Sequence, residues 1–256
     1  MARIVTLDIE TAPKVAYVWR FFKENISPKQ VKEHCRILSF AAKALDEKKV
    51  QYEESRSEDD REIVASLIDV LDKADIVVAH NGQAFDLATI KGRAVAHGLK
   101  PPSPYKVVDT LTSARKEFNF ESNTLEYLAT VLNCKRRKLS HKQFPGFELW
   151  LECLKGNKAA WKELKTYNIE DVLVLEEVYL KMRPYISNHP NVGVFEEGEE
   201  VVCPKCGSDD VHFRGYAYTQ VSRYHKFQCQ DCGSWGRTRY DTKSKEVRKN
   251  LGTNAI

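Results

Sequence analysis

The chain has 256 residues, of which 42% are hydrophobic and 30% are charged, and its formal net charge is +4. That length accommodates one sizeable α/β domain with a small module, or two modest domains. Mean hydropathy is −0.49, and no apolar run approaches the roughly 20 residues that span a bilayer, so a membrane role has no support.

The N-terminus enters a strand-like run at residues 4–7 without the apolar stretch and cleavage site of a signal peptide. Four of the seven cysteines form two Cys-x-x-Cys pairs, and the other three are scattered singly. This usage is typical of metal binding in a reducing compartment and not of a disulfide framework. We therefore expect a cytoplasmic protein.

The predicted elements alternate between strands and helices. Five segments have the β-branched or continuously apolar character of strands, at residues 3–9, 36–44, 49–53, 74–79 and 105–108. Six segments have apolar residues at helical spacing, at residues 59–72, 86–97, 110–118, 125–133, 159–164 and 169–182. The first three strands follow one another directly and predict a meander. The whole order predicts an α/β fold, a mixed sheet with helices on its faces.

A domain boundary is expected after the last helical pattern, which Pro184 closes. Residues 187–200 contain Pro190 and two glycines and have the composition of a linker. We expect a first domain at residues 1–186 and a small second domain at residues 201–256.

Carboxylates mark the first strand and a later helix start. Asp8 and Glu10 stand two residues apart on the strand, so both side chains leave one face about 6.6 Å apart. Buried charge is costly unless it is paired or metal-bound, which favours a metal site over the alternative, a polar edge strand. Asp86 follows the apolar strand at residues 74–79 and begins a helix, where an N-cap role is the alternative.

The last helical pattern carries a tyrosine and an aspartate on one face. Tyr167 and Asp171 are four residues apart. The alternative is a tyrosine at the edge of the core beside a solvated acid. Asp109 ends the strand at residues 105–108, and we expect it to be an N-cap in preference to a metal ligand.

The order and spacing of five residues resemble the DEDD, or DnaQ-like, superfamily of 3′-to-5′ exonucleases over roughly residues 1–185. These residues are Asp8, Glu10, Asp86, Tyr167 and Asp171. The final helix of that superfamily bears Tyr-x-x-x-Asp or His-x-x-x-x-Asp, and Thr166 stands where the histidine would be, so the resemblance is to the tyrosine subclass. The Asn-Gly-x-x-Phe-Asp stretch at residues 81–86 is similar to the second exonuclease motif of family B DNA polymerases.

The resemblance implies a ribonuclease-H-like fold and hydrolysis of phosphodiester bonds from a 3′ end. It implies that Asp8, Glu10, Asp86 and Asp171 hold two Mg²⁺ or Mn²⁺ ions. Tyr167 would orient the attacking water, because a phenol with a reference pKa of about 10 is a poor general base. The chain is similar to predicted exonucleases of bacteria and their phages, which would place it in the host cytoplasm if it is of phage origin.

The expected substrate is DNA, as single strands or frayed 3′ ends, in preference to RNA. Asn81 and Phe85 are candidates for contact with the terminal nucleotide, and a packed core phenylalanine is the alternative for Phe85. Only contacts to the 2′-OH distinguish RNA from DNA, and no residue can be assigned to them, so an exoribonuclease is an alternative. A non-catalytic nucleic-acid-binding or replication-complex adaptor is another, but such a protein would be expected to lose carboxylates that this chain retains.

Two near-identical knuckles contain Cys203, Cys206, Cys229 and Cys232, and glycine follows the second cysteine of each. Four thiolates at this spacing predict the closed tetrahedral site of a structural zinc ion, hence a zinc ribbon at residues 201–256. A redox site would need a single Cys-x-x-Cys in a βαβ context.

Basic and aromatic residues interleave between and after the knuckles, which favours contact with nucleic acid. The candidates for it are Arg214, Arg223, Lys226 and Trp235. The alternative is that the aromatic residues form the core of the ribbon, which would dock to replication or repair proteins.

Overall fold

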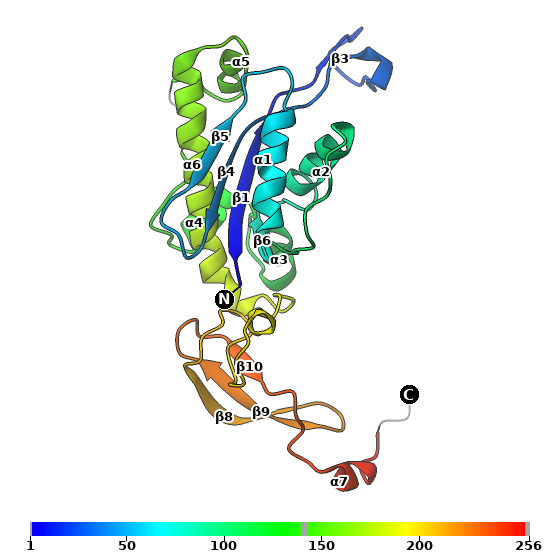
Figure 1. Cartoon of the computed structure of the whole chain (residues 1–256), viewed down its shortest axis with the longest axis vertical. Helices are drawn as coiled ribbons and strands as arrows, with labels where there is room; N and C mark the ends of the chain where they lie inside the picture. The colour runs from blue at the N-terminus through cyan, green and yellow to red at the C-terminus, as the bar shows by residue number, and fades with distance from the viewer. Residues whose placement is uncertain (1, 140–142, 254–256) are drawn as a thin grey trace. The chain divides into compact units, whose positions relative to one another are not determined.

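The computed structural model describes residues 2–139 and 143–253 (Figure 1). The chain divides into two compact units, one formed by Arg3–Tyr179 and one formed largely by Leu180–Ile256. Among the described residues, no helix is both long enough and apolar enough to cross a bilayer.

The first unit is built on a five-stranded mixed sheet with the strand order β5-β4-β1-β6-β7. Its strands are β1 (Ile4–Thr11), β4 (Ile37–Ala44), β5 (Gln51–Glu54), β6 (Ile76–Ala79) and β7 (Lys106–Asp109). Strands β1, β4 and β5 form the antiparallel meander, whereas β6 and β7 run parallel to β1. The predicted mixed sheet is confirmed.

Helices cover both faces of this sheet (Figure 1). They are α1 (Arg61–Asp72), α2 (Asp86–Ala96), α3 (Thr110–Glu117), α4 (Leu125–Val131), α5 (Glu148–Leu154) and α6 (Lys158–Met182). Val5, Leu7 and Ile9 of β1 are buried in one core with apolar residues of α1 and α2. Because side chains alternate along a strand, Asp8 and Glu10 point to the opposite face, toward α6.

Helix α6 differs from the sequence prediction, because the two helical patterns at residues 159–164 and 169–182 are one continuous helix of 25 residues. No Gly or Pro separates them. The apolar periodicity breaks at Tyr167 and Asn168 because that turn faces the polar site described below. The seven-residue helix α5 was not predicted.

A short hairpin, also not predicted, extends the β1–β4 pair beyond the sheet. It consists of β2 (Val15–Ala16) and β3 (Val31–Glu33), with the 3-10 helix η1 (Pro28–Gln30) before β3. The amide of Ala12 donates to the carbonyl of Arg36 at 2.8 Å, which continues the pairing of Thr11 with Ile37.

The second unit contains a three-stranded antiparallel sheet with the order β10-β9-β8. Its elements are the 3-10 helices η2 (Arg183–Tyr185) and η3 (Val192–Phe195), strands β8 (Val211–Tyr218), β9 (Arg223–Cys229) and β10 (Trp235–Arg237), and helix α7 (Lys245–Lys249). Residues 187–200, expected to be a linker, pack against the cysteine knuckles. Val192 is buried there, and its amide donates to the carbonyl of Pro204 at 2.8 Å.

Candidate active site

Three carboxylates from two elements meet on the α6 side of the sheet. Asp8 and Glu10 come from β1 and Asp171 comes from α6, and one ligand oxygen of each lies within 4.8 Å of the others. Asp171 is only 4% exposed. Because β1 and α6 are separated by most of the unit's sequence, the tertiary fold alone brings these groups together.

Asp86 joins the group through the backbone of β1. Its Oδ1 accepts a hydrogen bond of 3.0 Å from the amide of Ile9, the residue between Asp8 and Glu10. The N-cap alternative does not describe it, because Asp86 is the first residue of α2 and Phe85 is the cap. Gly82 lets the preceding turn close on β6, since a Cβ there would lie 2.2 Å from the Cβ of Ala79.

Burial and mutual repulsion disfavour the charged forms of these carboxylates. Burial raises the pKa of Glu10 to about 8 and that of Asp86 to about 6. The pKa of Asp8 is also raised, by burial first and then by the neighbouring Asp86 and Glu10. The raised pKa values reflect the burial of the carboxylates and how closely their oxygens are placed. A group of carboxylate oxygens is the donor set that hard divalent cations prefer.

Tyr167 lies on the same face of α6 as Asp171 and is 8% exposed. Its ring packs edge-on against Trp150, with 6.3 Å between centroids, and the Lys138 ammonium lies 4.6 Å from its centroid. Burial and then the Asp171 carboxylate raise the pKa of the phenol, so Tyr167 remains a hydrogen-bond donor at neutral pH.

Two side chains that the sequence did not single out hold the β1 carboxylates in place. Asn168 donates from Nδ2 to Asp8 Oδ2 at 2.6 Å, and Trp150 donates from Nε1 to Glu10 Oε2 at 3.0 Å. Ser39 of β4 donates to Asn168 Oδ1 at 3.1 Å and fixes the orientation of its amide. A polar residue between Tyr167 and Asp171 was the available signal for Asn168, whereas nothing local marked Trp150.

Lys138 is another side chain of the site that the sequence did not single out. Its Nζ forms an ion pair with Asp171 Oδ2. Burial by itself would lower the pKa of this ammonium, but the Asp171 carboxylate outweighs burial and raises it. Lys138 belongs to the basic run at residues 135–138, which in sequence is indistinguishable from solvated surface charge.

The turn before α2 contains the candidates for substrate contact. Asn81 is exposed with φ of 64°, and Phe85 is 43% exposed, so Phe85 is not a core residue. Asp109 accepts from the amides of Asn81 and Gln83, each at 3.1 Å. It also caps α3, as predicted, by accepting from Leu111 and Thr112.

The four cysteines of the second unit form a cluster whose sulfur atoms all lie within 4.8 Å of one another. The Cys203–Cys232 and Cys206–Cys229 sulfur pairs are each 3.6 Å apart. Four sulfurs at about 2.3 Å from a tetrahedral zinc ion would be about 3.8 Å apart, so the cluster fits zinc. The glycine after each knuckle has a positive φ, 80° at Gly207 and 76° at Gly233, as the tight turn requires.

The candidates for nucleic-acid contact on the ribbon are divided between two faces of its sheet. Arg223 and Lys226 are three residues apart on β9, so their side chains point to opposite faces. The Arg223 guanidinium lies 4.4 Å from the ring centroid of Tyr216, and the Lys226 ammonium lies 4.9 Å from that of Trp235. Both faces therefore combine cationic and aromatic groups.

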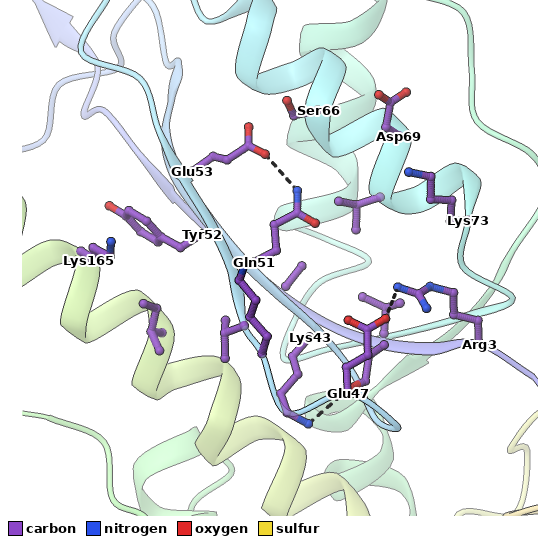
Figure 2. A pocket seen from close by; sticks show the side chains of 17 residues that line it. Arg3, Lys43, Glu47, Gln51, Tyr52, Glu53, Ser66, Asp69, Lys73 and Lys165 are labelled. Carbon is purple, nitrogen blue, oxygen red and sulfur yellow. Dashed lines mark hydrogen bonds and ion pairs between the residues drawn. The ribbon is translucent and has the colours of Figure 1, made fainter.

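Two other polar features of the first unit lie outside the carboxylate group. A hollow of about 620 Å³ runs along β4 and β5 and has mixed charges, with Arg3 and Glu47 paired at 2.8 Å (Figure 2). A cluster of Asp59, Asp60 and His97 lies where α1 meets α2. Asp60 is already engaged by Arg93 at 2.6 Å, so this cluster is an ion-paired network.

The comparisons with known proteins agree with this architecture. The family model described as RNase_H superfamily matches residues 29–183, a range that includes Asp86, Tyr167 and Asp171 and begins after β1. The family B DNA polymerase from the hyperthermophilic archaeon Pyrobaculum calidifontis is similar in structure, with a TM-score of 0.51 and 17% identity over 72% of this chain. The similarity spans 26% of that polymerase chain and concerns the fold alone. No curated protein matches this chain. The sheet order and the family match, which covers more than half of the sequence, together show that the chain belongs to the RNase_H superfamily.

Proposed function

We propose that this protein is a metal-dependent 3′-to-5′ exonuclease of the DEDD tyrosine type that trims DNA at single-stranded or frayed 3′ ends. The observation that carries the proposal is the meeting of Asp8, Glu10 and Asp171 within 4.8 Å, with Asp86 bonded to the same strand. Tyr167 stands one helical turn before Asp171 on α6.

The donor set fits two Mg²⁺ or Mn²⁺ ions held by Asp8, Glu10, Asp86 and Asp171. Such ions lower the pKa of bound water and stabilise charge on a scissile phosphate. The protein's own part is to keep the carboxylates in position, which Asn168 does for Asp8 and Trp150 does for Glu10. Tyr167 donates its hydroxyl proton in a hydrogen bond and orients the attacking water.

The second unit supports a role with nucleic acid. Residues 211–230 contain no Asp or Glu, and they alternate Arg, Lys and His with aromatic residues. We propose that Cys203, Cys206, Cys229 and Cys232 hold one structural zinc ion. We also propose that Arg214, Arg223, Lys226 and Trp235 contact the nucleic acid, with docking to a replication or repair protein as the alternative.

The test is cleavage of 5′-labelled single-stranded DNA, duplex DNA and RNA with Mg²⁺ or Mn²⁺. The wild-type protein should produce a ladder of shortened products and act best on single-stranded DNA. Asp8→Ala should abolish cleavage, and Tyr167→Phe should slow it by about 10²-fold, the typical effect of losing one positioned donor, without weakening substrate binding.

Asp59→Ala is the matched control, because the Asp59 side chain is 67% exposed and outside the site. Full activity of Asp8→Ala would contradict the site assignment. Immediate release of labelled mononucleotide would refute the direction. A preference for RNA would favour the exoribonuclease alternative, and binding without any cleavage would favour an adaptor.

A further inference from the structure

The loop between β2 and β3 exposes four aromatic side chains of the first unit to solvent. Relative exposures are 95% for Trp19, 93% for Phe21, 82% for Phe22 and 69% for Tyr17. Isolated exposed apolar residues are ordinary, but four aromatic residues within six positions form a patch of the kind that marks a binding surface.

The backbone of this loop is held in place although its aromatic side chains are exposed. The Glu24 carboxylate accepts from the amides of Trp19 at 3.0 Å and Arg20 at 2.8 Å. Gln30 donates to the carbonyl of Tyr17 at 2.9 Å and forms a capping box with Ser27 at the start of η1. The hydrogen bonds therefore fix a defined tip, and exposure of the rings does not result from an open chain.

The tip is joined to the strand that bears the catalytic carboxylates. The hairpin begins directly after Glu10 and Thr11, and the 2.9 Å bond from the amide of Tyr17 to the carbonyl of Gln30 continues its pairing. Figure 1 shows it projecting past the end of the sheet. Trp19 is eight residues after Thr11 in the chain, a distance of at most about 26 Å in an extended strand.

The charge of the hairpin favours a polyanionic partner. Residues 12–36 contain six Lys and Arg and two Glu. One of these acids, Glu24, is engaged by the loop amides, and the other, Glu33, lies 3.7 Å from Lys32. Arg20 and Lys23 are next to these aromatic residues in sequence, and cations interleaved with aromatic side chains are the combination that binds the backbone and bases of single-stranded nucleic acid.

We propose that Trp19, Phe21 and Phe22 form a binding site for unpaired bases of the strand whose 3′ end lies at the carboxylates. This inference rests on the proposed function. At about 3.4 Å per nucleotide, a reach of at most about 26 Å corresponds to about eight nucleotides. A 3′ end with about eight unpaired nucleotides is thus long enough to reach the tip, whereas four nucleotides at the same rise span only about 14 Å.

The test compares two triple variants in anisotropy titrations of labelled DNA, in buffer without added divalent metal. The first, Trp19→Leu/Phe21→Leu/Phe22→Leu, keeps apolar character and removes the rings. The second, Trp19→Phe/Phe21→Tyr/Phe22→Tyr, keeps the rings. On a 20-nucleotide single strand the leucine variant should bind at least about tenfold more weakly, while the ring-keeping variant stays near wild type.

Length and strandedness provide the controls. A 4-nucleotide strand and a blunt 20-base-pair duplex should bind the wild type and the leucine variant alike, because neither presents an unpaired base to the tip. An unchanged 20-nucleotide affinity in the leucine variant would overturn the inference, as would an equal loss on the 4-nucleotide strand. If the protein shows these binding differences but cleaves no substrate, the proposed function is wrong, whereas the binding of unpaired bases by the aromatic residues is still supported. Unchanged thermal unfolding confirms that the variants fold.

Discussion

At the scale of single residues, Lys138 is a cation that lies against the carboxylate group. It pairs with Asp171 and lies over the ring of Tyr167. A divalent ion bound by Asp8, Glu10 and Asp171 would compete with this ammonium for Asp171. We therefore expect Lys138 to stabilise the protein when no metal is bound and to oppose metal binding.

Lys138→Met should accordingly make the protein less stable without divalent metal and more responsive to it. If the variant binds the metal about tenfold more tightly than the wild type, saturating metal raises its free energy of unfolding by about 1.4 kcal/mol more. For a protein of this size, the gain in Tm on adding Mn²⁺ should then exceed that of the wild type by about 3–5 °C. Thermal unfolding with and without Mn²⁺ measures this.

The matched control is Lys135→Met, from the same basic run, where the amide contacts Glu177. Its response to Mn²⁺ should equal that of the wild type. An equal or smaller Mn²⁺ response in Lys138→Met would show that Lys138 does not compete with the metal.

At the scale of elements, a buried carboxylate joins β4, α1 and α2. Asp60 is fully buried and accepts from the amide of Ile37 at 2.8 Å and from Arg93 Nη2 at 2.6 Å, and it also lies 2.6 Å from His97 Nε2. Burial alone would raise the pKa of Asp60, but the hydrogen bonds from Arg93, Ile37 and His97 outweigh burial and lower it. These contacts fix α1 and α2 on the sheet face opposite the carboxylate site.

Asp60→Asn should therefore lower the free energy of unfolding at neutral pH by about 3 kcal/mol, because Arg93 loses its buried partner. A carboxylate with a lowered folded pKa stabilises the fold above its unfolded pKa of about 3.9 and loses that contribution as pH falls through the folded value. The difference in free energy of unfolding between wild type and variant should thus be largest near pH 7 and should shrink below about pH 4.

Urea unfolding between pH 3 and pH 7 measures this dependence. Asp59→Asn is the control, because its exposed side chain should change stability by less than about 0.5 kcal/mol. If Asp60→Asn lowers the free energy of unfolding by the same amount over this whole pH range, the ionised carboxylate is not the source of the stabilisation.

At the scale of the whole molecule, the two units are stabilised by different means. Arg3–Tyr179 contains a large apolar core between sheet and helices. The second unit has a three-stranded sheet whose exposed side chains outnumber its buried ones, with Phe227, Cys203 and Cys229 among the few buried groups. We therefore expect the second unit, with so small a core, to depend on a metal held by its four cysteines for folding.

Cys203→Ser/Cys206→Ser should reduce bound zinc from one ion per chain to nearly none and unfold the ribbon. Hydrogen exchange should show lost protection in residues 203–238 and unchanged protection in β1, β4 and β6. Cys35→Ser, which alters a single cysteine outside the knuckles, should retain zinc. Full zinc occupancy in the double variant would contradict the assignment of the zinc ligands. Lost protection across the first unit would contradict the claim that the metal stabilises only the second unit.

Much of the fold followed from local signals. Periodicity located β1, β4 and β6 because these strands are buried and largely apolar, and it located α1, α2 and α4 because each buries apolar residues on one face. It divided α6 in two because Asn168 is buried for its hydrogen bond to Asp8 and not for apolar contact. The β2–β3 hairpin was not predicted, because strand patterns rely on apolar residues that are buried. The aromatic residues of this hairpin are exposed instead.

The sequence by itself determined the four-cysteine cluster and the order of Asp8, Glu10, Asp86, Tyr167 and Asp171. Local spacing is enough to place Asp8 beside Glu10 and Tyr167 beside Asp171, because residues two apart on a strand or four apart on a helix share a face. The four cysteines followed instead from the characteristic spacing of zinc ligands. Only the tertiary structure decided that β1 and α6 place three carboxylates within 4.8 Å and that Lys138, Trp150 and Asn168 are their partners. Those contacts join positions more than 30 residues apart, where spacing carries no information and packing alone determines which side chains meet.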